Sequence, residues 1–109
     1  MQLEIQALNF QLTEVIHNYV ERRLGFSLSG RDEQIQRVIV HLTDINGPHG
    51  VMNKCCHIQI VLPQLSDVII EDTETDLYTA IDRATERSGR TIGRRLDLHH
   101  TQSRSSLQN

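Results

Sequence analysis

The chain has 109 residues, of which 38% are hydrophobic and 23% are charged. That length suits one domain and excludes two independent cores, and the composition excludes the low-hydrophobicity signature of disordered chains. Because 14 acidic and 11 basic residues give a net charge of −3, any polyanion must be bound by a local basic patch rather than by the field of the whole molecule. No apolar run approaches the ~18 residues of a membrane span, and the first residues do not resemble a secretory signal, so we expect a cytoplasmic protein.

Hydrophobic periodicity predicts a strand and then a helix in the first third of the chain. Residues 2–8, QLEIQAL, alternate apolar and polar side chains, as half-buried strands do. Thr13 can cap a helix over about 14–27, where apolar residues recur at every fourth position. The polar segment around Gly30 then predicts a loop. The apolar side of this helix comprises Ile16, Tyr19, Val20, Leu24 and Leu28.

Three further strands are expected before the last helix. They cover residues 35–45, 54–62 and 67–71, and a turn cluster, NGPHG, separates the first two. The short connections favour antiparallel pairing of these strands. The inward side chains are expected to be Val38, Val40 and Leu42 in the first of them and Cys56, Ile58, Ile60 and Leu62 in the second.

A second helix is expected over about 72–96, because Thr73 followed three residues later by Asp76 is typical of a helix start. Gly89 and Gly93 lie on its flank and each costs about 1 kcal/mol relative to alanine, so we expect them to permit close approach of another element, with the first helix as the candidate. On a helical wheel, the core face of this helix consists of Leu77, Ile81, Ala84, Ser88, Ile92 and Leu96.

The order of these elements predicts an α+β fold, β-α-β-β-β-α. Each strand and each helix offers one apolar face, which a four-stranded sheet with both helices packed on one face would bury. Residues 99–109 are polar and show no periodicity, so we expect a disordered tail after a single domain over residues 1–98.

The two cysteines and the scattered histidines predict neither a disulfide nor a metal site. Cys55 and Cys56 are neighbours in a predicted strand, so one thiol is expected to be buried and the other exposed. The segment CCH lacks the paired spacing of zinc ligands. No nucleophile, base and orienting group recur together, and no glycine-rich phosphate loop is present, so we expect no enzyme activity, cofactor or small-molecule substrate.

The last helix carries a row of arginines on the side opposite its core face. Residues 1–76 hold five basic and eleven acidic residues, net −6, whereas residues 77–109 hold six basic and three acidic ones, net +3. Guanidinium groups bind phosphates bidentately and stack on unpaired bases, which favours contact with a nucleic acid. The alternative is a solvated face in which Glu86 and Asp97 pair with the arginines. The row consists of Arg83, Arg87, Arg90 and Arg94, with Arg95 adjoining it.

Three more basic residues extend this hypothesis. Arg22 and Arg23 lie beside the apolar stripe of the first helix and could project along the groove between the helices. Lys54, which is the single lysine, opens the third strand and could sit at the end of the sheet beside them. The alternative for each is a solubilising charge on an apolar stem.

The segments LTEVIHNYVERRL, VIVHL and DLYTAIDRATERSGRTIGRRL resemble the ribosome hibernation promoting factors and ribosome-associated inhibitors, also called sigma-54 modulation proteins. The resemblance covers residues 1–98, and its most specific part is EDTETDLYTAID. It implies a fold similar to a double-stranded-RNA-binding module. It also implies binding to the small ribosomal subunit and its rRNA, in the channel used by messenger RNA and transfer RNAs, with inhibition of translation.

The resemblance also implies which residues bind rRNA. By position these are Arg22 and Arg23 after YVE, and Arg83, Arg87, Arg90, Arg94 and Arg95 on the last helix. The lysine-rich end of that helix, typical of relatives, is missing here, so we expect fewer phosphate contacts and salt-sensitive binding. The chain corresponds to the short form, without the dimerisation domain of longer relatives, and we expect a monomer.

Two alternatives stay open from the sequence. One is a domain that binds another structured RNA through the same basic patch. The other is a protein-interaction module that forms a homodimer or binds a regulatory partner through an exposed sheet face or edge. The side chains expected on that face are Ile39, His41, His57 and Val61.

Overall fold

The computed structural model describes residues 1–46 and 52–107, and the side chains of residues 46, 52 and 100–107 are not described. The predicted turn NGPHG therefore lies outside the described residues, apart from the backbone of its first residue. The elements are β1 (Gln2–Leu8), α1 (Glu14–Ser27), a short 3-10 helix η1 (Asp32–Gln34), β2 (Arg37–Asn46), β3 (Met52–Val61), β4 (Val68–Glu74) and α2 (Leu77–Leu107).

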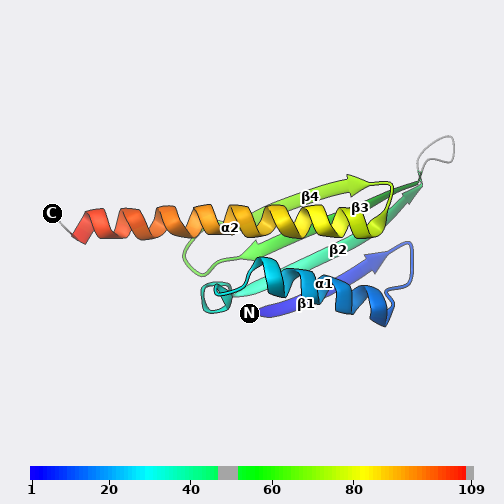
Figure 1. Ribbon diagram of the computed structural model, residues 1–109, viewed down its shortest axis with the longest axis horizontal. Helices are drawn as coiled ribbons and strands as arrows, with labels where there is room; N and C mark the ends of the chain where they lie inside the picture. Colours follow the sequence, from blue (N-terminus) through cyan, green and yellow to red (C-terminus); the bar gives the residue numbers. More distant parts are fainter. Residues whose placement is uncertain (47–51, 108–109) are drawn as a thin grey trace.

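The four strands form one sheet in the order β1-β2-β3-β4. β1 pairs in parallel with β2, because α1 carries the chain back across the sheet between them, and the other two pairs are antiparallel. Both helices cover the same face of the sheet (Figure 1). The predicted α+β architecture and the antiparallel pairing are confirmed.

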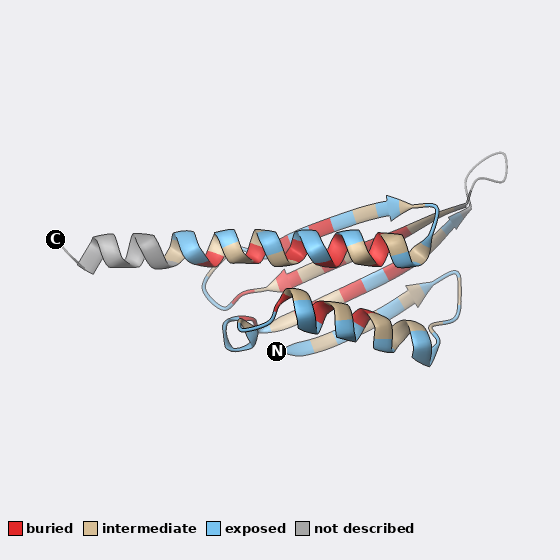
Figure 2. Ribbon diagram, viewed as in Figure 1, coloured by how far each residue is buried: buried red, intermediate tan, exposed pale blue. Residues whose placement is uncertain are grey.

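The core lies between this face of the sheet and the two helices (Figure 2). The inward side chains expected for β2 and β3 are all buried, and the helices bury the stripes that the periodicity predicted. Each fully buried aliphatic side chain contributes roughly 1.5–3 kcal/mol through removal of apolar surface from water. Two polar residues of α2, Thr85 and Ser88, are also fully buried, and their hydroxyls donate to the helix carbonyls of Ile81 and Ala84, each at 2.8 Å.

The boundary between β4 and α2 differs from the prediction. β4 continues to Glu74, so Thr73 belongs to the strand and the helix begins only at Leu77. Asp76 caps the helix instead, because its carboxylate accepts hydrogen bonds from the backbone N–H of Thr79 at 2.9 Å and from the Thr79 hydroxyl at 3.0 Å. At the other end α2 extends to Leu107, where the sequence predicts an irregular tail from residue 99, since neither glycine nor proline interrupts the chain after Gly93.

The prediction that one cysteine is exposed was wrong, because both are buried. Cys56 faces the core, and burial raises the pKa of its thiol to about 12. Cys55 points to the opposite face, where Thr43 of β2 and Thr73 of β4 flank it in the sheet and leave it only 8% exposed. Burial raises the pKa of the Cys55 thiol as well, so both groups are protonated at neutral pH.

The expectation that glycines in the last helix permit close approach was correct for Gly89. A Cβ atom at Gly89 would lie 2.6 Å from the carbonyl oxygen of Ser27, at the end of α1. A Cβ atom at Gly93 would lie 3.4 Å from a guanidinium nitrogen of Arg31, in the loop after α1. Glycine at position 89 therefore lets the end of α1 pack directly against α2, whereas a Cβ at Gly93 would make only an ordinary van der Waals contact.

Candidate nucleic-acid interface

The four predicted arginines of α2 are all exposed, and none lies on the buried face of the helix. The spacing of 4, 3 and 4 residues keeps them within about 40° of one another around the helix. At 1.5 Å per residue they extend over about 17 Å of the helix axis. The direction of the row was therefore predicted correctly.

Two members of the row pair with carboxylates of β4. Arg83 Nε lies 3.1 Å from Glu74 Oε1, and Arg87 Nη1 lies 3.4 Å from Asp72 Oδ2. Arg87 also donates to the carbonyl oxygen of Glu71 at 2.9 Å. Because the arginine side chains remain 63% and 46% exposed, such pairs contribute only ~0–1 kcal/mol each. The sequence pattern places these carboxylates in the helix, so the two pairs were not predicted.

The other two members, Arg90 and Arg94, lie near Arg31, which was not predicted as a site residue. Arg90 and Arg94 line a groove of about 660 Å³ together with Arg31. None of the ion pairs among the described residues involves these three side chains. The sequence signal was indirect: Arg31 follows Gly30, which in the structure has a φ of 81°, and its guanidinium lies beside Gly93 of α2. Arg31, Arg90 and Arg94 are called here the three-arginine cluster, and Arg87 and Asp97 line the same groove.

Two predicted site residues lie away from the row. Arg95 is turned towards the loop between β3 and β4, where its Nη1 donates to the carbonyl oxygen of Ser66 at 3.2 Å. Lys54 Nζ lies 2.7 Å from Asp44 Oδ2 at the end of the sheet, and both side chains are mostly buried. The geometry thus gives both residues a structural partner within the domain.

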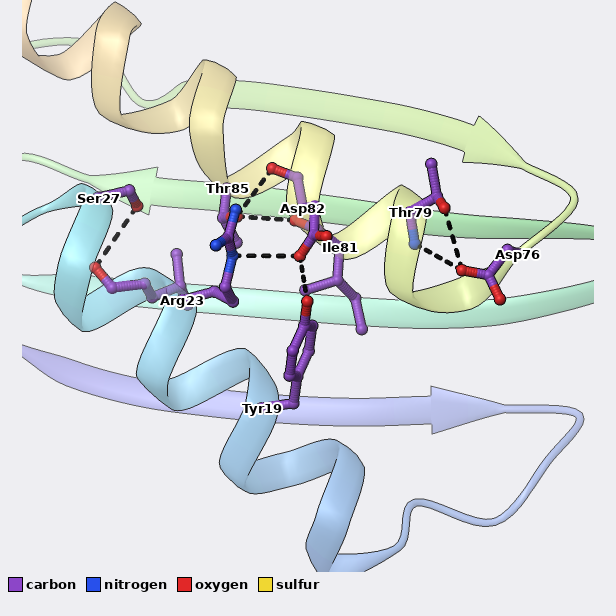
Figure 3. A network of polar contacts seen from close by, with 9 residues as sticks. Tyr19, Arg23, Ser27, Asp76, Thr79, Ile81, Asp82 and Thr85 are labelled. Atoms are coloured by element: carbon purple, nitrogen blue, oxygen red, sulfur yellow. Dashed lines mark hydrogen bonds and ion pairs between the residues drawn. The ribbon is translucent and has the colours of Figure 1, made fainter.

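Arg23 belongs to a polar network that connects the two helices (Figure 3). Its Nε lies 3.1 Å from Asp82 Oδ1, and the same oxygen accepts a hydrogen bond of 2.5 Å from the Tyr19 hydroxyl. This hydrogen bond is the main cause of a raised pKa at Tyr19, with burial second. The Tyr19 ring also meets Tyr78 edge-on, at 4.8 Å between centroids. Arg23 therefore projects into the groove between the helices as predicted, but its charge is compensated there.

Arg22 keeps its charge at the surface. Its guanidinium carbon lies 5.6 Å from the centre of the Tyr19 ring, a cation–π arrangement that orients the side chain without neutralising it. Of the two basic residues predicted on α1, Arg22 is therefore the one available to an external anion.

The opposite face of the sheet is not covered by either helix (Figure 1). Strand alternation places Ile39, His41, His57 and Val61 on it, as predicted, and the two histidine rings stack across β2 and β3 at 6.2 Å. Exposed apolar side chains on this face are Leu8, Ile45 and Ile69. The alternative function, as a protein-interaction module, depends on this face.

The described residues show no other site chemistry. Among them, no three His, Cys, Asp or Glu side chains are grouped so as to hold a metal ion. Nor does any helix in the described part of the chain combine the length and apolar character needed to cross a membrane.

Comparisons with known proteins agree with this fold. The N-terminal domain of Protein Y from Thermus thermophilus is 28% identical and superposes with a TM-score of 0.69, covering 86% of this chain and 98% of that one. A ribosomal subunit interface protein from Coxiella burnetii is 15% identical and superposes with a TM-score of 0.76, covering 89% of this chain and 99% of that one. A search among curated proteins gives no match. The family model of the sigma 54 modulation protein / S30EA ribosomal protein matches residues 3–99. The chain therefore belongs to the sigma 54 modulation protein / S30EA ribosomal protein family.

Proposed function

We propose that this protein is a non-enzymatic, cytoplasmic hibernation factor that binds the rRNA of the small ribosomal subunit. In this proposal it occupies the channel used by messenger RNA and transfer RNAs and thereby inhibits translation. Membership of a family described as ribosomal supports the ribosome as the partner. The observation that carries the proposal is the cluster of Arg31, Arg90 and Arg94 on one side of the molecule, because none of these side chains forms an ion pair among the described residues.

The predicted rRNA contacts divide into three groups by their partners. Arg90 and Arg94, with Arg31 added, meet phosphates directly, and Arg22 extends this surface along α1. Arg83 and Arg87 join them by exchanging β4 carboxylates for phosphates, which costs little because exposed ion pairs are weak. Arg23, Lys54 and Arg95 contribute less, since each is held by an internal partner.

The test is co-sedimentation of the protein with purified small ribosomal subunits in sucrose gradients at several salt concentrations. Because Arg90 and Arg94 form no ion pair among the described residues, changing both to Gln removes phosphate contacts without breaking an internal pair. We expect the double variant R90Q/R94Q to bind at least tenfold more weakly, while its free energy of unfolding stays within about 0.5 kcal/mol of wild type.

The matched control is Arg37→Gln on the uncovered face of the sheet, where Arg37 makes only a long contact of 4.0 Å with Glu4. This variant should bind small subunits like wild type. Equal binding by R90Q/R94Q and wild type would refute the proposed surface.

The second candidate function is protein interaction through the uncovered sheet face, favoured by the exposed Leu8, Ile45 and Ile69. Apolar association should be insensitive to salt, whereas binding to rRNA should fall steeply as salt is added. Light scattering of the free protein at two salt concentrations therefore separates the candidates, because the rRNA-binding proposal expects a monomer in both.

A further inference from the structure

The end of α1 and the outer side of α2 form a continuous groove. One part, of about 400 Å³, is lined by Phe26, and the adjoining part, of about 660 Å³, is lined by Arg31 and Arg94. Gly89 and Arg90 line both parts and join them into one groove, called here the α1–α2 groove. Both volumes fall within the range of roughly 300–1,000 Å³ that is usual for small-molecule sites.

Phe26 supplies an apolar platform at one end of this groove. The chain has four Phe and Tyr residues, and all lie in the described part. Phe10 and Tyr19 pack against the core and Tyr78 packs edge-on against Tyr19, whereas Phe26 is 82% exposed. A single exposed apolar side chain is common on protein surfaces, so Phe26 is informative only because of its neighbours.

Those neighbours are cations, and their position is set by the close packing of the helices. Gly89 lies against Ser27, which brings the last turn of α1, and Phe26 with it, beside Arg90 of α2. Further along, the guanidinium of Arg31 lies beside Gly93 and lines the groove together with Arg94. An aromatic ring is thus followed along one groove by three arginines that form no ion pair among the described residues.

We propose that the α1–α2 groove binds one unpaired nucleotide of an RNA, with its base stacked on Phe26 and its flanking phosphates held by Arg90, Arg94 and Arg31. An aromatic side chain beside arginines is a common arrangement for bases that have left a helix, because each base has a π-face and each nucleotide carries a phosphate. A paired base cannot enter, since its faces are covered by its neighbours in the stack. The proposal rests on RNA binding as the function of this surface.

Two carboxylates also line the groove and refine the proposal. Glu86 lies in the part near Phe26, and Asp97 lies in the part near Arg94. Carboxylates accept hydrogen bonds but repel phosphates, so Glu86 is placed to accept from an amino group of the base or from a 2′-hydroxyl. Arginines outnumber the one carboxylate in the part near Arg94, whereas the part near Phe26 combines an aromatic ring with a carboxylate, so a ligand with phosphates at the first and a base at the second matches this distribution.

The test uses two short RNA hairpins of equal length, one fully paired and one with a single bulged 2-aminopurine. Stacking on an aromatic ring quenches 2-aminopurine fluorescence, so the probe reports stacking separately from affinity. We expect wild-type protein to bind the bulged hairpin about tenfold more tightly than the paired one and to quench its fluorescence. Equal affinity for the two hairpins, with no quenching, would overturn the inference.

Variants of Phe26 separate stacking from apolar contact. Phe26→Ala and Phe26→Leu should lose both the preference for the bulge and the quenching, while Phe26→Tyr should keep them. Val15→Ala is the matched control, because Val15 is 68% exposed on the same helix but lies far from the groove, in its first turn. Since Phe26 is almost fully exposed, these changes should leave folding intact. If Phe26→Ala kept both the preference for the bulged hairpin and the quenching of 2-aminopurine, the proposed role of Phe26 would be refuted.

Failure of this inference is distinguishable from failure of the proposed function. If wild type co-sediments with small subunits but neither prefers nor quenches the bulged hairpin, the nucleotide site is refuted and rRNA binding stands. If wild type binds neither subunits nor hairpins, both are refuted. If Phe26→Ala instead abolishes a dimer seen by light scattering of wild type, Phe26 belongs to a protein contact and the nucleotide site is refuted.

Discussion

Tyr19 shows how one side chain can couple the two helices. Its hydroxyl donates to Asp82 on α2, and Asp82 also pairs with Arg23, so two side chains of α1 share one carboxylate of α2 (Figure 3). Hydrogen bonds to charged groups are stronger than neutral ones, and this one joins α1 to α2 beside the ion pair of Arg23. The raised pKa of Tyr19 makes this contact testable by pH.

We expect Tyr19→Phe to reduce the alkaline loss of stability. Because the folded state holds the Tyr19 proton more tightly than the ordinary pKa of 10.0, this contribution is fully present below pH ~10 and is lost as pH rises through the folded pKa. The variant should be less stable than wild type by about 1 kcal/mol at pH 8, and the difference should shrink above pH 10. Urea unfolding at several pH values measures this. A difference that stayed constant from pH 8 to pH 11 would contradict the assignment.

At the scale of elements, the contact between α1 and α2 depends on the absence of one side chain. Gly89 lies where a Cβ atom would meet the backbone of Ser27 at 2.6 Å, a distance that requires the helices to separate. Gly25 is a glycine of α1 with no atom within 4 Å of such a Cβ. The two positions therefore form a matched pair for testing close packing.

We expect Gly89→Ala to lower the free energy of unfolding by about 1–3 kcal/mol, because overpacking outweighs the gain in helix propensity. Gly25→Ala should raise it by up to about 1 kcal/mol, since that site gains helix propensity without a clash. Urea denaturation of both variants beside wild type provides the measurement. Equal stabilisation by the two substitutions would show that the helices do not touch at Gly89.

At the scale of the whole molecule, carboxylates of β4 would compete with the proposed RNA ligand for the arginines of α2. The net charge is −3, and two arginines of the outer row pair with Glu74 and Asp72 of β4. Such pairs offset part of the positive charge of the row. When phosphates of a ligand replace the carboxylates of Glu74 and Asp72, Arg83 and Arg87 become further cationic contacts.

We therefore expect the double variant D72N/E74Q to bind small ribosomal subunits more tightly, by roughly threefold to tenfold at low salt. It frees Arg83 and Arg87 and changes the net charge from −3 to −1, so the dependence of binding on salt should steepen. The control E4Q/E71Q makes the same change in charge on the uncovered face of the sheet. Co-sedimentation across a salt series compares the three proteins. If the control gained as much affinity as D72N/E74Q, net charge alone and not the release of the arginines would be responsible.

The sequence by itself determined the order of the elements, the inward faces of the strands and helices, and the outward direction of the arginine row. These features depend on periods of two and 3.6 residues, which operate within one element and can be read locally. Even the need for close packing at Gly89 was visible, because a glycine in a helix is costly without such a reason.

Only the tertiary structure decided which arginines keep an unpaired charge. The carboxylates that pair with Arg83 and Arg87 belong to β4, and the sequence placed them in the helix because acidic residues before an apolar stripe also fit a helix start. Arg31 lies in the site because the loop after α1 packs beside α2. Cys55 is buried because residues of β2 and β4 flank it. Contacts between elements depend on how strands and helices pack in space, which no local period encodes, so the functional surface was settled by packing rather than by pattern.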